Sequence, residues 1–232
     1  MKKSIRTLGI ALVVLMGASS AVAHNPIVIN GGPTNADTAN VIEDISLSQV
    51  GYHEATAASP TMWFQLEGQV EQTLSVELGV PYINRYAGLR PAAVLLGPGL
   101  PPLDLPFDVP DGLGGIVFTS EGLAPEVFDE EFTGTISWIW PAQEYVFETA
   151  GTYYLVGYIP SGEDGKFWVA VGKTEAFGLS DIIRLPQVLS SVRSFHEIGP
   201  FGGILFWIMI AIIGLLVALL GLAARSLFFL AA

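Results

Sequence analysis

The stretch that decides the fold is TMWFQLEGQVEQTLSVEL, residues 61–78. Both halves alternate: Met62, Phe64 and Leu66 share one face of the first run, and Leu74, Val76 and Leu78 share one face of the second. A repeat of two residues is the signature of a half-buried β-strand, because successive strand side chains point to opposite faces. The stretch therefore predicts two amphipathic strands, 61–67 and 73–78, joined by a turn.

The same pattern recurs on both sides of this stretch. Short runs bounded by Gly, Pro, Asn and Asp predict further strands at 45–53, 92–96, 115–119, 134–140, 143–148, 152–159 and 166–172. About nine short strands indicate a mainly β fold, and we expect a jelly-roll-like β-sandwich over residues 45–177. The Asp164-Gly165 pair tolerates positive φ, so the last two strands are expected to pair as a hairpin.

Composition narrows the function classes. The chain has 232 residues, 22 acidic and 10 basic ones, and no cysteine, which excludes disulfide scaffolds, thiolate metal sites and cysteine nucleophiles. Six of the basic residues and all 22 acidic ones lie between His24 and Gly202, so this part has a formal charge of −16. Nucleic acid is excluded as a partner, because phosphate binding needs clustered Lys and Arg.

The first 23 residues resemble a secretory signal peptide. Lys2, Lys3 and Arg6 precede an apolar run from Leu8 to Met16, and Ala21-Val22-Ala23 forms an A-x-A cleavage site. Cleavage would leave His24 as the mature N-terminus, followed by an extended segment over 24–44. We expect the folded body to be exported to the periplasm or the cell surface.

The C-terminal part predicts membrane attachment. Residues 201–224 lack charge and are long enough for one transmembrane helix, with residues 225–232 as a cytoplasmic tail. Residues 178–200 have helical apolar spacing, with Ser180 as a candidate N-cap. This juxtamembrane amphipathic helix is expected either at the outer membrane surface or packed on the sandwich.

Small residues recur on one stripe of the expected span. They are Ala211, Gly214, Ala218 and Gly221. Such a stripe lets a second helix approach closely, which favours a protein partner or a homo-oligomer in the membrane.

A proline-rich insertion from Gly97 to Gly115 interrupts the strand pattern. Proline cannot donate to a strand ladder, so this segment is expected to run over the surface and to offer a contact surface. Asp104, Asp108 and Asp111 supply the hard oxygen ligands that calcium prefers, and a calcium site is one hypothesis for this loop. Loop solvation and turn capping explain the same aspartates.

Copper is a second metal hypothesis. An N-terminal histidine offers an amine and an imidazole nitrogen together, so mature His24 could chelate copper with His53 or His196. Neither of those two histidines is spaced from another potential ligand as in a metal-binding motif. No sequence motif requires a cofactor.

No nucleophile elbow, P-loop, zinc signature or dinucleotide motif occurs in the sequence. We therefore expect a non-enzymatic binding, accessory or scaffold subunit of a membrane assembly. An exported hydrolase that uses a carboxylate pair is a third hypothesis, beside the copper protein.

Four segments in order carry a family resemblance: MWFQL with QTLSV, then AVLLGP, then YVFETAGTYYLV, then GKFWVAV. Together they resemble the bacterial pre-peptidase C-terminal β-sandwich over residues 45–172. The long insertion from Gly97 to Gly115 departs from that pattern. The resemblance implies a non-catalytic accessory or adhesive module, and it transfers no catalytic residue.

Overall fold

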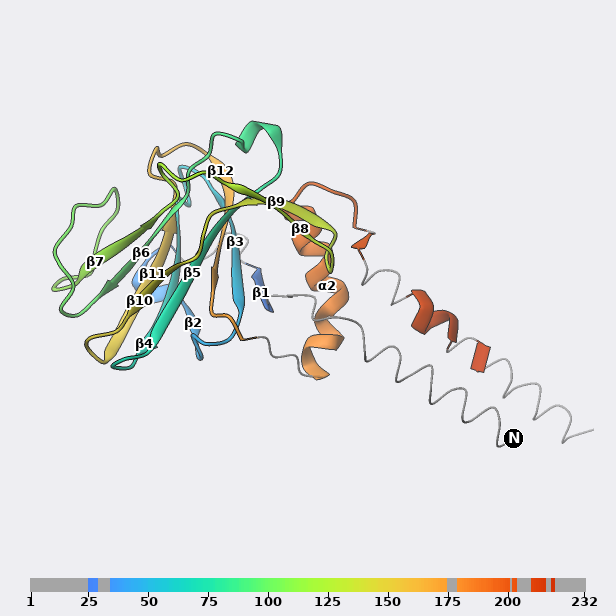
Figure 1. Ribbon diagram of the computed structural model, residues 1–232, viewed down its shortest axis with the longest axis horizontal. Helices are drawn as coiled ribbons and strands as arrows, with labels where there is room; N and C mark the ends of the chain where they lie inside the picture. Colours follow the sequence, from blue (N-terminus) through green and yellow to red (C-terminus); the bar gives the residue numbers. More distant parts are fainter. Residues whose placement is uncertain are drawn as a thin grey trace, which may run out of the picture.

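The computed structural model of the chain describes residues 25–28, 34–174, 179–200, 202–203, 210–215 and 218–219 (Figure 1). The expected signal peptide 1–23, His24, Gly221 and the tail 225–232 lie outside the described residues, as does most of the expected span 201–224. No helix within the described residues combines the length and the apolar character needed to cross a membrane.

Two β-sheets make up most of the described part of the chain. The larger sheet has seven strands in the order β1-β3-β12-β5-β9-β8, with β10 also paired to β5. Their bounds are β1 Asn25–Val28, β3 Gln49–Ala55, β5 Thr73–Pro81, β8 Glu126–Glu130, β9 Thr135–Ile139, β10 Gln143–Val146 and β12 Gly165–Val171.

The smaller sheet has five strands in the order β2-β4-β11-β6-β7. Their bounds are β2 Asn40–Ile42, β4 Thr61–Gly68, β6 Ala92–Gly97, β7 Gly114–Thr119 and β11 Gly151–Tyr158. Two short 3₁₀ helices, η1 (Ala36–Thr38) and η2 (Asn84–Tyr86), lie in the connections. The mainly β, two-sheet architecture predicted from the sequence is therefore confirmed.

All nine strands predicted from the alternating pattern are present, with ends that differ by a few residues. The pattern missed β1, β2 and β8. The first two have four and three residues, which is too short for a period to register, and β8 is mostly exposed with the sequence EVFDE.

The predicted hairpin between the last two strands is wrong. Strand β11 pairs with β4 and β6 in the smaller sheet, whereas β12 pairs with β3 and β5 in the larger one. The connection with Asp164 therefore carries the chain across the sandwich. Strand β12 is buried on both faces, as is the second half of β11, and a turn signal between two such strands does not say which neighbour each one pairs with.

The main core fills the space between the sheets. Met62, Phe64 and Leu66 of β4 face Leu74, Val76 and Leu78 of β5, together with residues from β6, β11 and β12. Trp63 lies on the opposite face of β4, outside this core. The face assignment made from the alternation is thus confirmed.

Helix α2 (Leu179–Phe195) packs on the outer face of the larger sheet (Figure 1). Phe195 contacts the cluster of Val50, Trp168 and Ala170, and Leu189 and Val192 are also buried. Of the two placements that the sequence left open for this helix, the structure has the one on the sandwich. The helix begins at Leu179 and contains Pro186, so Ser180 lies inside it and does not precede it.

The outer face of the smaller sheet is covered by the proline-rich loop, which we define as residues 98–113 between β6 and β7. Its apolar side chains pack on Trp63, Val94 and Tyr158 of the sheet. The side chains that make this contact are Leu103, Leu105, Phe107, Val109 and Leu113. The loop is an ordered excursion over the surface, as its prolines predicted.

Candidate functional site

A groove of about 580 Å³ separates the proline-rich loop from the segment Thr34–Asp37. Trp63 of β4 lies beneath the groove and is buried, because the ring of Phe107 meets that of Trp63 edge to face, with centroids 5.8 Å apart. The indole Nε1 of Trp63 donates to Thr61 Oγ1 at 2.9 Å, so its polar edge is already satisfied. The groove therefore offers Phe107 and the prolines Pro60, Pro106 and Pro110 as its apolar lining, with orientation left to the polar rim.

The rim of this groove carries acidic and amide groups. Asn35, Asp37 and Asp108 line it, and all three are exposed. Asn35 Oδ1 accepts a hydrogen bond from the Thr38 amide at 3.2 Å, which fixes the segment on one side. Phe107 fixes the other side through Trp63. A groove with this lining is suited to binding, and its acidic groups are the exposed carboxylates of Asp37 and Asp108.

The three aspartates of the calcium hypothesis stand on the solvent side of the loop. Leu103, Leu105, Phe107 and Val109 face the sheet, and the residues between them are exposed. Asp104 and Asp108 belong to that exposed set, and Asp111 is exposed at the end of the loop. Within the described residues, no group of three or more His, Asp or Glu side chains is arranged to hold a metal ion.

A second site is the junction where the chain leaves the sandwich after α2. Arg193, which is buried, donates from Nη1 to the carbonyls of Thr133 and Gly134 at 2.6 and 3.2 Å, and from Nε to that of Gly199 at 2.6 Å. One guanidinium thus joins the helix, the β8–β9 turn and the segment that follows the helix. Such a charge-assisted fork has both strength and a fixed direction.

Two glycines complete this junction. A Cβ atom on Gly203 would lie 2.7 Å from the backbone carbon of Thr133, and one on Gly202 would lie 2.6 Å from the Arg193 guanidinium. Both have positive φ, at 72° and 146°. Only glycine lets the chain pass this close to the β8–β9 turn in that conformation.

The end of α2 is itself held by an unusual residue. The Ile198 amide donates to the Arg193 carbonyl and the Glu197 amide to that of Ser194, both at 3.0 Å, which is a Schellman motif. Glu197 therefore occupies the left-handed position, with φ of 58°, where glycine is usual. Its carboxylate pairs with Arg85 and with Lys166. Hydrogen bonds from Arg85 and Lys166 lower the pKa of Glu197, so its side chain has a role that glycine could not supply.

A serine–histidine contact that no sequence motif predicted lies beneath this junction. Ser137 Oγ is 3.0 Å from His196 Nε2, and the two residues are 59 positions apart in the chain. His196 Nδ1 is 2.8 Å from the Val192 carbonyl and must donate there, so Nε2 accepts from the serine hydroxyl. Trp168 Nε1 donates to the same Ser137 oxygen at 3.2 Å.

This pair has the geometry of a nucleophile and its base, but not the access. Ser137 and His196 are 4% and 5% exposed, and Phe195 and Tyr52 pack against the imidazole. Burial, with contributions from Lys166 and Arg193, lowers the pKa of His196 to about 4. The contact is therefore a satisfied polar link between α2 and β9.

His53 lies on the other side of the larger sheet from His196. Tyr52 contacts the His196 ring, whereas the ring of the next residue, His53, lies 5.5 Å from Phe167 in the main core. Adjacent strand residues point to opposite faces, so the sheet separates the two histidines. His53 Nε2 is 2.9 Å from the Ser59 carbonyl, and burial lowers its pKa. The copper hypothesis on His24 and the hydrolase hypothesis stay predictions.

The small-residue stripe is described only in part. Ala211 and Gly214 lie in the helical stretch 210–215, and Ala218 lies in the helical pair 218–219; all three are exposed. Gly221 lies outside the described residues. The role of the stripe in association stays a prediction.

The chain was compared with protein families, curated proteins and solved structures, and only the solved structures include a similar protein. No protein-family model matches the chain, and no curated protein matches its sequence. Among solved structures it is similar to the pre-peptidase C-terminal domain of a collagenase from Bacillus anthracis, with 14% identity and a TM-score of 0.31 over 60% of this chain and 97% of that one. This likeness is weak and concerns the fold alone.

Proposed function

We propose that the chain is an exported, membrane-anchored β-sandwich without catalytic activity, which serves as a binding or accessory subunit of a membrane assembly. The apolar segment 201–224 would anchor it, with the sandwich outside the membrane and residues 225–232 in the cytoplasm. The leader 1–23 and the formal charge of −16 on the exported part support this orientation and a soluble, lipid-repelled head.

The observation that carries the proposal is the junction after α2. Arg193 and the Gly202-Gly203 pair hold the chain against the β8–β9 turn at the start of the apolar segment 201–224. A tethered domain that only captures ligands needs no such fixation, because a flexible linker serves it as well. A fixed exit favours a subunit whose head must keep one orientation relative to its anchor.

The proline-rich loop adds a candidate contact surface. Its groove combines the ring of Phe107, which packs on buried Trp63, with the polar rim of Asn35, Asp37 and Asp108. Aromatic residues are enriched at protein interfaces, where an apolar body and a polar edge both find partners. The burial of the Ser137–His196 pair, by contrast, favours a structural role for this serine–histidine contact.

Native mass measurement of the intact chain, extracted in a mild detergent, tests the proposal. We expect a stoichiometric partner or a homo-oligomer. A bare monomer from cells at native expression level would contradict an assembly role.

A matched pair of insertions tests the junction itself. A flexible Gly-Ser-Gly-Ser segment placed after Gly199 should leave the head folded but reduce recovery of the partner by about tenfold. The same insertion at Gly162, in an exposed turn between β11 and β12, should leave recovery unchanged. Equal recovery with both insertions would show that orientation is irrelevant.

A further inference from the structure

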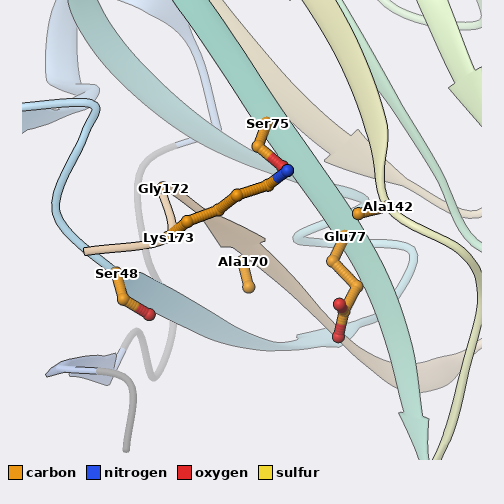
Figure 2. Close-up of a pocket in the computed structure, with 7 residues that line it drawn as sticks. All are labelled: Ser48, Ser75, Glu77, Ala142, Ala170, Gly172 and Lys173. Carbon is orange, nitrogen blue, oxygen red and sulfur yellow. The ribbon is translucent and has the colours of Figure 1, made fainter. Parts of the chain in front are cut away.

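A pocket of about 210 Å³ opens on the outer face of the larger sheet (Figure 2). Three small residues line it, Ala142, Ala170 and Gly172, together with Ser48, Ser75, Lys173 and Glu77. Glu77 is the one acidic side chain in this lining. In Figure 2 its carboxylate points away from the side chain of Lys173.

The pocket exists because strand β5 changes partners beside Glu77. On one side β5 pairs with β9 over Gly79–Pro81 and with β10 over Thr73–Val76, so no strand pairs with Glu77 there. Trp140, in the connection between β9 and β10, turns into the main core. Ala142 is left at the rim. On the other side Glu77 is directly opposite Ala170 of β12, whose methyl group fills little space.

The carboxylate of Glu77 has no hydrogen bond or ion pair with any described residue, and burial alone raises its pKa. A partly buried carboxylate without a partner is costly, since it loses water and gains nothing in return. An incoming cation would recover that loss.

The nearby lysine does not supply this cation. Lys173 Nζ binds Glu144 of β10 at 2.5 Å, and its side chain runs across Ser75 in Figure 2. Because Glu144 is directly opposite Ser75 in the ladder, this ion pair bridges β5 and closes one end of the pocket. The charge of Lys173 is therefore paired with Glu144 and does not neutralise Glu77.

We propose that the Glu77 pocket binds one primary ammonium group, carried either by a small amine or by a lysine side chain of a partner protein. One carboxylate matches one compact ammonium, whereas a divalent metal needs several oxygen ligands, and no such group occurs among the described residues. The methyl groups of Ala142 and Ala170 would contact the methylenes next to the nitrogen. This inference stands on the pocket and does not depend on the accessory role.

The test uses the intact chain in detergent micelles with ¹³C-labelled alanine methyl groups. The probes are n-butylammonium and Nα-acetyl-lysine N-methylamide, titrated at about 150 mM salt so that general attraction to an acidic surface is screened. We expect saturable shifts of the Ala142 and Ala170 methyl signals. Tighter binding of the lysine derivative points to a protein source, and tighter binding of butylammonium points to a free amine.

Three variants decide the outcome. Glu77→Gln should weaken binding at least tenfold, whereas Glu126→Gln, which removes the same charge from exposed β8, should leave it unchanged. Ala142→Leu keeps the carboxylate but fills the mouth of the pocket, and should also abolish binding. Absence of saturable shifts with both probes, or equal binding by the wild type and Glu77→Gln, would overturn the proposal.

Discussion

Single buried polar residues fix how α2 meets the larger sheet. His196 donates to Val192 and accepts from Ser137, which in turn accepts from Trp168, so every member of this chain of hydrogen bonds is satisfied. Such a network is specific because a buried donor or acceptor without a partner is costly. It also makes the stability of the fold depend on pH, because the imidazole is buried in its neutral form.

The pH dependence of stability follows from His196. Its pKa is about 4 in the folded chain against an ordinary 6.5, so the unfolded chain binds more protons between these values. The free energy of unfolding is therefore undiminished by His196 above pH 6.5. It falls by about 3 kcal/mol in all as the pH is lowered toward 4. Urea unfolding of the wild type and of His196→Gln at pH 4.5 and 7.5 measures it. The variant should show the smaller loss on acidification, and equal losses would contradict the assignment.

The indole ring of Trp168 packs directly on the backbone of Gly79, so this position should not tolerate a side chain. A Cβ atom there would lie 2.0 Å from the indole ring of Trp168, so Gly79→Ala must displace this ring from its place under α2. We expect a loss of about 3 kcal/mol in the free energy of unfolding. Gly88→Ala is the control, since a Cβ atom at Gly88 meets nothing within 4 Å, and it should change stability by less than about 1 kcal/mol.

At the scale of the element, two different segments each cover part of one outer face of the sandwich. Helix α2 covers the larger sheet, and the proline-rich loop covers the smaller one. The loop reaches this role without regular structure, because its extended backbone sends every second side chain to the sheet. Prolines limit its freedom in the unfolded chain, which lowers the entropy lost when it is ordered.

Phe107 is the main anchor of the loop. Its ring contacts Trp63 and Tyr158, with centroids 5.8 and 5.3 Å away. Phe107→Ala should lower the free energy of unfolding by about 2 kcal/mol and shift tryptophan emission to the red, because water reaches Trp63. Val127→Ala on exposed β8 should leave both unchanged. Unaltered emission from Phe107→Ala would mean that the loop stays closed without this ring.

Arg193 is expected to dominate the junction after α2. Arg193→Gln leaves the carbonyls of Thr133 and Gly134 without their donor, and should cost about 3 kcal/mol in chemical unfolding. Arg85→Gln removes a side chain that is 52% exposed and pairs with Glu197, so its cost should stay below about 1 kcal/mol. Similar losses of stability in the two variants would contradict a dominant role for the buried Arg193 hydrogen bonds.

At the scale of the whole molecule, connectivity and charge act together. Within the described residues, only β6–β7 and β8–β9 pair as neighbours in sequence, and the other consecutive strands change sheet or partner. The fold therefore depends on contacts between distant segments. The part between His24 and Gly202 also carries a formal charge of −16, which repels itself in the compact state.

Salt should therefore stabilise the molecule. Raising NaCl from about 10 mM to about 150 mM shortens the screening length from about 30 Å to about 8 Å and weakens this repulsion. The urea midpoint should rise, and KCl should have the same effect because only ionic strength matters. A midpoint that falls with both salts would mean that ion pairs such as Glu197 with Lys166 outweigh the repulsion.

The sequence alone determined nine of the twelve strands within the described residues and the faces that β4 and β5 bury, because a period of two is a local property of the chain. It also indicated the surface course of the proline-rich loop, since proline excludes ladder pairing at each position where it occurs. Only the tertiary structure decided that β11 and β12 belong to different sheets, that Ser137 meets His196, and that a partner change beside Glu77 opens a pocket. These features arise from contacts between segments far apart in the chain, and no local pattern encodes which distant segment a strand will meet.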